Sequence, residues 1–452
     1  MWKREKLIKS LQEKGLLVDG IDENLQLDKL LNTLGELSTT FHSEDKLLAL
    51  FMENNSFVKA GLNATKEIAY TFMNKNAELF DIVMDKGIVT KISNIRESNL
   101  HLLPMMFHYG GRINNMIETF NFWWKGRRIP ASRDGVKELL WNLRDSFTGS
   151  LIDSLDHLAE KALGLSLSDQ YWIRPSEDIT WDKVNFFTNP FSEDIGKLLI
   201  EGDWSGGSLE SPDNTSDGVI RKRWKIVGNT RCLIKSSTGV PWYAQPYREV
   251  FASKLARLML KPFDIKFVVP YTILKENDEV YSMCPNFVTP STEYVQFNQI
   301  VVGRKVKDYQ EAFQFCCSFY GECAYVMDIM FLLDYLLLNE DRHTGNFGLI
   351  RDVNTGKVLR PAPIFDTGSS LFHNSISLDT SKVGAKPFHR EHDLQVSLVD
   401  RLRYRESLVL AQEGLATVFW DSFETSTEDE ERLHRIYQIV HNRIKTLLTE
   451  GS

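Results

Sequence analysis

The sequence is most informative at NEDRHTGNFGLI (residues 339–350) and, after a short turn, at PAPIFDTGSSLF (residues 361–372). The first segment follows an apolar run, Tyr325–Leu338, which predicts a buried helix. In the second segment Asp366 comes directly after the apolar pair Ile364–Phe365, as at the end of a strand. A loop and a strand end are therefore expected to bring polar side chains to one place.

Three oxygen-bearing side chains in these segments fit phosphoryl transfer. Asp341 and Asn346 have the spacing D-x4-N, and Asp366 belongs to a D-x-G that follows downstream. A carboxylate orients the attacking hydroxyl, while Mg²⁺ takes an amide oxygen and a second carboxylate besides phosphate oxygens. The spacing and the order equal those of a protein-kinase catalytic site. Taken alone, Asp341 and Arg342 also fit a solvated ion pair, so the interpretation depends on the combination.

The string FDTGSS also matches the active-site turn of pepsin-like aspartic proteases. Those enzymes need two aspartates that share a proton. The sequence has no second such motif, because the Asp-Gly pairs at 19–20, 134–135 and 217–218 lack the intervening hydroxyl residue. A helical second half is also wrong for an all-β protease, so this alternative is not favoured.

A kinase also needs a cation that holds phosphates. Lys235, at the end of the strand-like RCLIK, is the candidate, and Glu249 on the following predicted helix is placed to pair with it. The glycine- and serine-rich stretch 206–219 comes before both and offers backbone donors, although it is not a G-x-G-x-x-G. Solvated side chains and a linker are the alternative interpretation of these residues.

Length and composition describe an ordinary globular protein. The 452 residues suffice for roughly two or three domains, and 42% hydrophobic with 25% charged residues argue against wholesale disorder. A net charge of −8 argues against a protein that coats nucleic acid or anionic membrane over its whole surface, although it leaves room for local basic patches, and direct binding of nucleic acid is not expected. No stretch has the roughly 18 apolar residues of a membrane helix, and the charged start MWKREKLIKS is unlike a signal peptide. Five cysteines without paired spacing predict reduced core residues in a cytoplasmic protein.

The hydrophobic pattern predicts an α+β fold. Residues 1–90 are predicted to be a helical accessory domain, including a helix over ATKEIAYTFMNKNAELFDIVMDKG (64–87). Residues 91–287 are predicted to form an N-terminal, sheet-bearing lobe with a hairpin at Gly228–Asn229 and one helix. Residues 288–452 are predicted to form a helical lobe.

The last predicted helix has a marked beginning and one apolar face. Thr427 and Glu430 have the spacing of a capping box, in which each side chain bonds to the backbone of the other residue. The predicted apolar face consists of Leu433, Ile436, Tyr437, Val440, Ile444, Leu447 and Leu448.

Several stretches of the sequence together carry a family resemblance. They are GLSLSDQYWIRP (164–175), SPDNTSDG (211–218), CLIKSS (232–237), QPYREVFASKLARLM (245–259), YSMCPNF (281–287), NEDRHTGNFG (339–348) and IFDTGSSL (364–371). Together they resemble the HipA-like serine/threonine kinases of bacterial toxin-antitoxin systems and their phage-associated relatives. The likeness covers about residues 94–400 and does not reach the first ninety residues. Its DRH-x2-N loop is shared with phosphatidylinositol kinases.

The resemblance implies a two-lobed protein-kinase-like fold and a role for the residues of the catalytic loop. It implies that Asp341 is the catalytic base and that His343 supports the loop. It also implies that Asn346 and Asp366 hold Mg²⁺.

The resemblance further implies an ATP site. Lys235, fixed by Glu249, would contact the phosphates under a loop that runs from Ser211 to Gly218. The connection between the lobes would meet adenine through Met283, Cys284, Asn286 and Phe287. In this family such a loop can carry an autophosphorylated serine. SPDNTSDG departs from the family's compact loop, which leaves three candidates: Ser211, Thr215 and Ser216.

The sequence therefore predicts an ATP- and Mg²⁺-dependent serine/threonine protein kinase, of the kind that acts as a toxin regulated by autophosphorylation. The expected partners are a protein substrate of unknown identity and an antitoxin protein, without a membrane. A phosphatidylinositol-type lipid kinase is one alternative, favoured if the segment between Thr367 and Asp393 binds a lipid headgroup. A non-catalytic kinase-fold binding module is the other, and the complete set of Lys235, Asp341, Asn346 and Asp366 argues against it.

Overall fold

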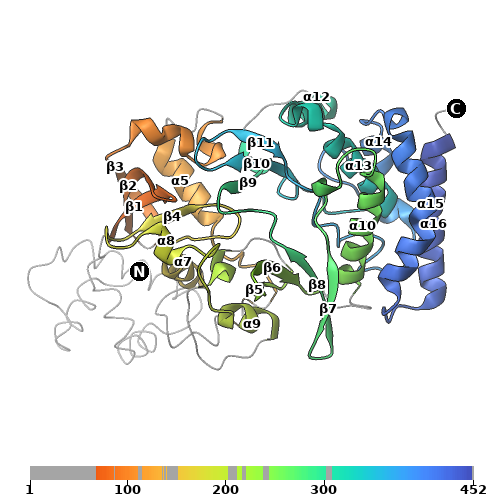
Figure 1. The fold of residues 1–452 in the computed structure, drawn as a ribbon, viewed down its shortest axis with the longest axis horizontal. Coiled ribbons are helices and arrows are strands. Elements are labelled where there is room, and N and C mark those ends of the chain that lie inside the picture. The colour runs from red at the N-terminus through yellow and green to blue at the C-terminus, as the bar shows by residue number, and fades with distance from the viewer. Residues whose placement is uncertain are drawn as a thin grey trace, which may run out of the picture.

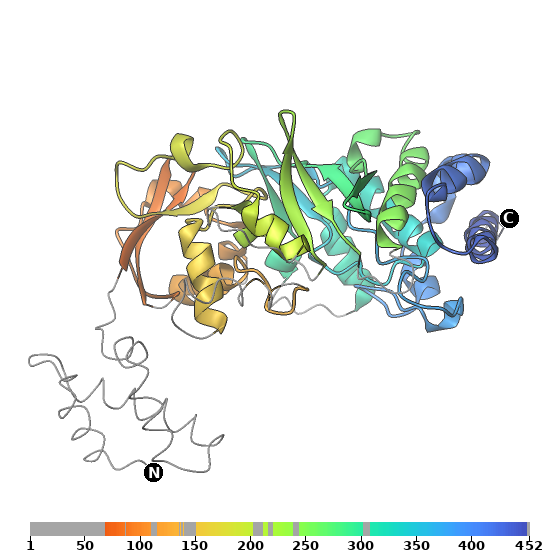
Figure 2. The same ribbon diagram turned by 90° about the horizontal axis from the view of Figure 1, so that it is seen from below.

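The computed structural model describes residues 68–85, 87–109, 115–134, 136, 139, 151–201, 211–215, 220–237, 244–301 and 308–449. Along the longest axis an N-terminal sheet with its helices lies at one end, two further sheets lie in the middle, and a helical layer lies at the other end (Figure 1). Figure 2 shows the same order from below, with α15 (Arg405–Phe423) and α16 (Glu430–Thr449) at the end opposite the N-terminal sheet. The α+β class is confirmed, with sheets first and helices last.

The first sheet occupies a region that the sequence pattern assigned to helix. Its antiparallel strands are ordered β3-β2-β1-β4, and their bounds are Ile68–Asn74 (β1), Ala77–Asp85 (β2), Ile88–Ser93 (β3) and Tyr171–Arg174 (β4). The helix predicted over 64–87 is therefore wrong throughout its described part. The inward residues of β2 follow the strand period of two from Phe80 to Met84. The remaining residues of the predicted helical accessory domain, 1–67, lie outside the described part of the chain.

An aromatic core holds this sheet against its helices. Phe72 on β1 contacts Phe120 and Trp123, both on α5, with ring centroids 5.0 Å apart in each case. The guanidinium of Arg127 lies over the Trp123 ring at 4.3 Å from its centroid. The helices of this part are α5 (Met116–Lys125), α7 (Leu151–Lys161), α8 (Trp181–Val184) and α9 (Asp194–Glu201).

The second sheet contains the predicted hairpin and is ordered β5-β6-β8-β7. Gly228 has a φ of 60°, a conformation that glycine adopts without strain, and it turns the chain between the first two strands. One helix, α10 (Gln245–Met259), follows β6, as predicted. The strand bounds are Lys222–Val227 (β5), Thr230–Lys235 (β6), Thr272–Glu276 (β7) and Glu279–Pro285 (β8).

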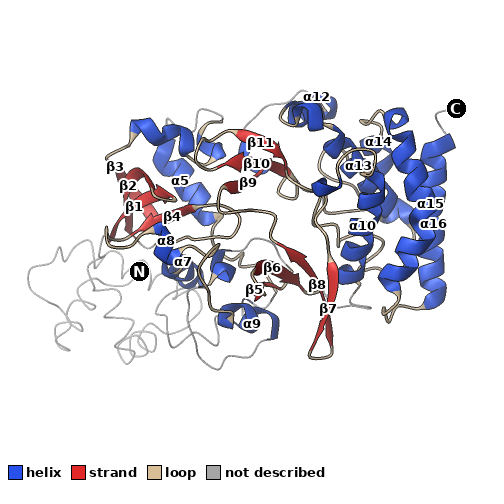
Figure 3. Cartoon of the chain, in the orientation of Figure 1, coloured by secondary structure: helices blue, strands red, loops and turns tan. Residues whose placement is uncertain are grey.

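The chain then crosses to a small third sheet and the helical lobe (Figure 3). The third sheet is ordered β11-β10-β9, with bounds Thr292–Gln296 (β9), Gly348–Asp352 (β10) and Val358–Pro361 (β11). Before β10 the chain forms α11 (Asn298–Val301), α12 (Tyr309–Ser318) and α13 (Tyr325–Leu337), and after β11 it forms α14 (His392–Val396). The buried helix predicted from Tyr325 is thus present as α13.

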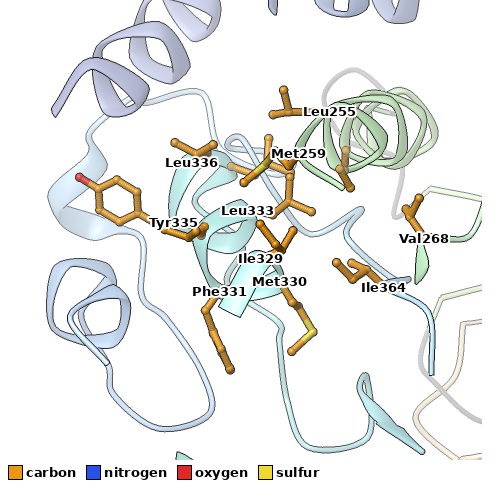
Figure 4. Close-up of a cluster of buried hydrophobic side chains, with 14 of the residues drawn as sticks. Leu255, Met259, Val268, Ile329, Met330, Phe331, Leu333, Tyr335, Leu336 and Ile364 are labelled. Carbon is orange, nitrogen blue, oxygen red and sulfur yellow. The ribbon is translucent and has the colours of Figure 1, made fainter. Parts of the chain in front are cut away.

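The largest hydrophobic core joins α10 to the helical lobe. Figure 4 shows Leu255 and Met259 of α10 facing side chains of α13, including Leu333 and Leu336. Gly414 lets α15 approach α10 closely, because a Cβ atom there would lie 2.4 Å from a methyl carbon of Leu258. Burial of this apolar surface is the main force that attaches α10 to the lobe.

The last helix differs from its prediction only at its beginning. Its apolar face is buried at Leu433, Ile436, Val440, Ile444 and Leu447, as predicted. The backbone N–H of Arg432, however, donates to the Asp429 carboxylate at 2.9 Å. The cap is therefore Asp429 rather than Thr427, because the helix starts at Glu430 and a cap side chain reaches the third N–H that follows it.

The cysteines and the lengths of the apolar helices bear on two further expectations from the sequence. The five cysteines are free; Cys232, Cys284 and Cys316 are buried, whereas Cys317 and Cys323 are partly exposed. Within the ranges that the structure describes, no helix combines the length and the apolarity needed to span a membrane.

Candidate active site

The sheet and the helical lobe meet at a buried lysine. Lys235 ends β6, and its ammonium group forms ion pairs with Glu249 of α10 and with Asp366. The Ser282 hydroxyl of β8 donates to the second Glu249 oxygen at 2.7 Å. The predicted contact between the strand lysine and the helix glutamate is present, and Asp366 joins it.

Burial and charge attraction oppose each other in this cluster: burial raises the pKa of Glu249, whereas charge attraction prevails at Lys235 and Asp366. Burial by itself would lower the pKa of Lys235, but the Asp366 and Glu249 carboxylates outweigh it, so the pKa is raised. Burial favours the neutral form of Asp366, yet the cations of Lys235 and Lys222 outweigh it and hold the pKa of Asp366 below its usual value. Asp366 is therefore an ionised carboxylate next to a protonated lysine, the charge state that a metal and phosphate site needs.

The loop after α13 carries Asp341 and Asn346, and bonds within the loop orient both residues. The Asn346 amide nitrogen donates to the Asp341 carbonyl at 3.0 Å, and the Asp341 N–H donates to the Asn339 side chain at 3.1 Å. Because the nitrogen of Asn346 is used as a donor, its oxygen is the atom that the side chain can offer to a cation.

Arg342 fixes this loop, a role that the sequence interpretation missed. The Arg342 guanidinium is fully buried and pairs with Asp334 of α13, with an Nε to Oδ2 distance of 2.8 Å. It also donates to the carbonyls of Asn346, at 3.0 Å, and Phe365, at 2.7 Å, and so ties the loop to the residue before Asp366. The signal was a charged residue, Asp334, within the apolar stretch Ile329–Leu337 of this helix, because a buried carboxylate requires a partner.

His343, which was expected to support the loop, is exposed instead. Its Nδ1 accepts a bond from the Gly345 N–H at 3.0 Å, a contact within the loop itself. Besides Arg342, the Tyr294 hydroxyl, which donates to the Gly345 carbonyl at 2.9 Å, and the Asn298 N–H, which donates to the Thr344 carbonyl at 3.0 Å, hold the loop to the rest of the protein.

The segment expected to cover the phosphates is packed rather than open in its described part. Ser211 has no exposed surface, and Thr215 is 6% exposed. Asp213 holds the segment inward, because its carboxylate accepts from Ser211 Oγ at 3.0 Å and from the Trp224 N–H at 2.9 Å. Residues 211–215 are therefore packed against the neighbouring strand, whereas Ser216 and Gly218 lie outside the described residues.

The residues expected to meet adenine lie largely within β8. Met283 and Cys284 pair with Ile234 and Leu233 of β6, and the Asn286 N–H donates to the Arg231 carbonyl at 2.8 Å. The Phe287 ring contacts Phe365, the residue before Asp366, at 5.3 Å. Their role in binding a nucleotide stays a prediction.

A cavity of about 520 Å³ opens beside this site. Its walls come from the second sheet, from the third sheet with α11, from Phe365 and from the N-terminal part of the chain. The lining residues nearest the cluster are Lys222, Trp224, Leu233, Tyr294 and Phe365. Its described lining includes none of residues 283–287. The volume and the aromatic walls suit a ligand of the size of a nucleotide.

Comparison with known proteins returns kinases. No protein-family model matches the chain. A serine/threonine-protein kinase CtkA from Helicobacter pylori is 46% identical over 54 residues, which is 12% of this chain and 16% of that protein. The chain thus matches about one sixth of that relative's own length. This local match agrees with the family resemblance of the sequence.

Two solved structures are similar to the described fold. The crystal structure of the Helicobacter pylori proinflammatory kinase CtkA has a TM-score of 0.39 at 18% identity, over 51% of this chain and 94% of that one. HipA from Shewanella oneidensis, in a complex with HipB and its operator DNA, has a TM-score of 0.48 at 10% identity, over 83% of this chain and 97% of that one.

Proposed function

We propose that this protein is an ATP- and Mg²⁺-dependent serine/threonine protein kinase of HipA-like type. The observation that carries the proposal is the contact of the buried Lys235 with both Glu249 and Asp366. A lysine held by a helix carboxylate, next to a second carboxylate and across from a D-x4-N loop, is the arrangement that phosphoryl transfer from ATP requires.

The residues present fit a magnesium ion. Asp366 supplies an ionised carboxylate and Asn346 an amide oxygen, the ligand types that this hard cation prefers. Over the described part of the chain no cluster of three or more His, Cys, Asp or Glu side chains could hold a metal alone, so the remaining ligands would come from phosphate oxygens and water. A bound Mg²⁺ would neutralise charge on the transferring phosphoryl group.

The chain's own residues divide the remaining work. Lys235 is placed to bind phosphate oxygens, and Glu249 keeps it oriented. Asp341 accepts the proton of the acceptor hydroxyl while the acceptor oxygen bonds to the γ-phosphorus. The bond from that phosphorus to the β–γ bridging oxygen breaks, and its electron pair leaves with ADP.

Intact-mass measurement after incubation with ATP and Mg²⁺ tests this proposal. The parent protein is expected to gain phosphate on itself or to label a protein substrate, and Asp366→Asn is expected to lose transfer together with the dependence of ATP binding on Mg²⁺. Asp182→Asn, which changes an exposed carboxylate, is the matched control. Unchanged ATP affinity in a Mg²⁺ titration of Asp366→Asn would remove Asp366 from the metal site.

The proposal extends to the location of the kinase, its partner protein and its autophosphorylation. We infer that the kinase acts on a protein in the cytoplasm, which the free state of its five cysteines supports. HipA's structure includes HipB and DNA, and a comparable antitoxin partner is proposed here by analogy. The expectation that this chain does not itself contact nucleic acid stays a prediction. Autophosphorylation at Ser211 requires that the segment first leave its buried position, since Ser211 has no exposed surface, whereas Thr215 lines the cavity of about 520 Å³ and its hydroxyl donates to the Leu165 carbonyl.

The pH dependence of stability reports on the attachment of that segment. Burial raises the pKa of Asp213 to about 7, from 3.8, even though the Trp224 N–H, Ser211, Arg133 and Arg223 all favour its ionised form. Between these two values the folded protein holds a proton that the unfolded chain has lost. Stability is therefore fully present below about pH 4, falls as the pH rises through 7, and is level above that.

We expect the melting temperature to fall more steeply between about pH 5 and about pH 8 in the parent than in Asp213→Asn, which cannot ionise. Asp182→Asn should behave as the parent does. Equal slopes in the parent and Asp213→Asn would show that Asp213 does not titrate in this range.

A further inference from the structure

A lysine far along the chain contacts the candidate base. Lys386 Nζ lies 2.9 Å from Asp341 Oδ1, and the two side chains are 52% and 43% exposed. Glu340 and His373 are the other ionisable residues in the cavity of about 440 Å³ that Asp341 and Lys386 line together. An exposed ion pair of this kind contributes little to stability, so its position beside the base is the informative feature.

The backbone of Lys386 is held in place more firmly than its exposure suggests. The Gln395 amide of α14 donates to the Lys386 carbonyl at 2.6 Å and accepts from the Phe388 N–H at 3.1 Å. The Phe388 ring is buried against Phe331 and Phe313, with centroid separations of 5.5 Å and 5.7 Å. A single glutamine and a buried ring thus fix the segment, while the lysine side chain stays free to turn.

Within the described loop from Asp341 to Asn346, the one permanently charged cation, Arg342, already has its own partners and does not serve a phosphate. The side chains between Asp341 and Asn346 are described in full, and Arg342 is spent on Asp334 and two carbonyls. His343 Nδ1 accepts a bond from Gly345. Lys235 is paired with Glu249 and Asp366.

We propose that Lys386 is a second phosphate-binding cation, which turns from Asp341 to the γ-phosphate when ATP binds. The proposal rests on the proposed kinase function and adds a residue to it. An acceptor oxygen that is hydrogen-bonded to Asp341 attacks a phosphorus about 3–3.5 Å away, so a group bonded to Asp341 is within one side-chain rotation of the transferring phosphoryl oxygens. As the acceptor oxygen bonds to phosphorus and ADP leaves with the electron pair, Lys386 compensates the charge on those oxygens while Asp341 takes the acceptor's proton.

Lys386→Met tests the contact without relying on turnover. Because ADP lacks the γ-phosphate, the variant should bind a non-hydrolysable ATP analogue about tenfold more weakly while its ADP affinity stays unchanged, given the strength of one charge-assisted hydrogen bond. Lys386→Arg, which keeps the charge, should restore most of the analogue affinity. Lys382→Met removes an exposed lysine from the same segment and should match the parent.

Turnover, followed as ADP release, separates the two proposals. For Lys386→Met we expect kcat to fall about 10²-fold, the size of the loss of one donor at a developing charge. An unchanged ratio of analogue to ADP affinity, or parental kcat, in Lys386→Met would overturn the role of Lys386. A parent protein that transfers no phosphate, combined with a shifted affinity ratio in the variant, would overturn the kinase function and leave the Lys386 contact standing.

Discussion

Replacing Asp341 by asparagine is expected to lower phosphoryl transfer by about 10² to 10⁴, the usual contribution of a positioned general base. Nucleotide binding should persist, because the cluster of Lys235, Glu249 and Asp366 does not include Asp341. The fold should also persist, since the side chain is 43% exposed and Arg342, not Asp341, holds the loop. Binding and chemistry should therefore separate in this one variant.

The same variant distinguishes the acceptors. Parent and Asp341→Asn are each incubated with labelled ATP and either a proteome extract or phosphoinositide vesicles, and Asp400→Asn, an exposed carboxylate, is the control. Loss of label from a protein band supports the protein kinase, and loss only from lipid supports the lipid kinase. A variant as active as the parent would mean that the D-x4-N spacing does not mark the catalytic loop.

Replacing Glu428 by glutamine is expected to give the largest loss of stability. The Glu428 carboxylate is fully buried between Arg248 of α10 and Arg432 of α16. The two guanidiniums also donate to the carbonyls of Leu371 and Phe372, just after the Asp366 motif. Removing the carboxylate with which both buried arginines pair should destabilise the helical lobe by about 3–5 kcal/mol.

Thermal unfolding followed by far-UV circular dichroism measures this effect. We expect a fall in the melting temperature of roughly 5–15 °C for Glu428→Gln. Glu424→Gln changes an exposed carboxylate nearby and should leave the curve where it is. A parental melting curve for Glu428→Gln would show that water or rearranged side chains satisfy the two arginines.

The contact between Lys235 and Glu249 could be predicted from the sequence because both residues lie on regular secondary-structure elements. The hairpin and the helix could both be recognised from the sequence pattern. They place Lys235 at a strand end and Glu249 about one turn into α10, so a contact between the two side chains could be expected. The position of Asp341 in a loop could also be predicted, because it comes shortly after the end of the apolar helix α13.

Three features could not be predicted because they depend on residues distant in the sequence. Lys386 reaches Asp341 only after the chain has gone through β10, β11 and a long connection. Ser211 is in a polar segment that Asp213 turns inward through a strand formed later, at Trp224. β1 and β2 were taken for a helix because AELFDIVMD also places apolar residues at helical spacing, and β4, the second partner of β1, follows about one hundred residues later.

The contacts of α10 determine whether the helix that carries Glu249 is able to move. Glu249 faces Lys235, while its neighbour Arg248 is locked to Glu428, and Phe251 packs edge-on against Phe419 of α15 at 5.1 Å. In many protein kinases the helix that bears this glutamate swings to switch the enzyme on or off. Here α10 is attached to the C-terminal part of the chain by the Arg248–Glu428 ion pair and by the packing of Phe251 on α15. A swing of α10 would break both contacts. The strand that carries Lys235 is paired with β8, whose Ser282 donates to Glu249, so the sheet and the helical lobe together hold the lysine against the glutamate.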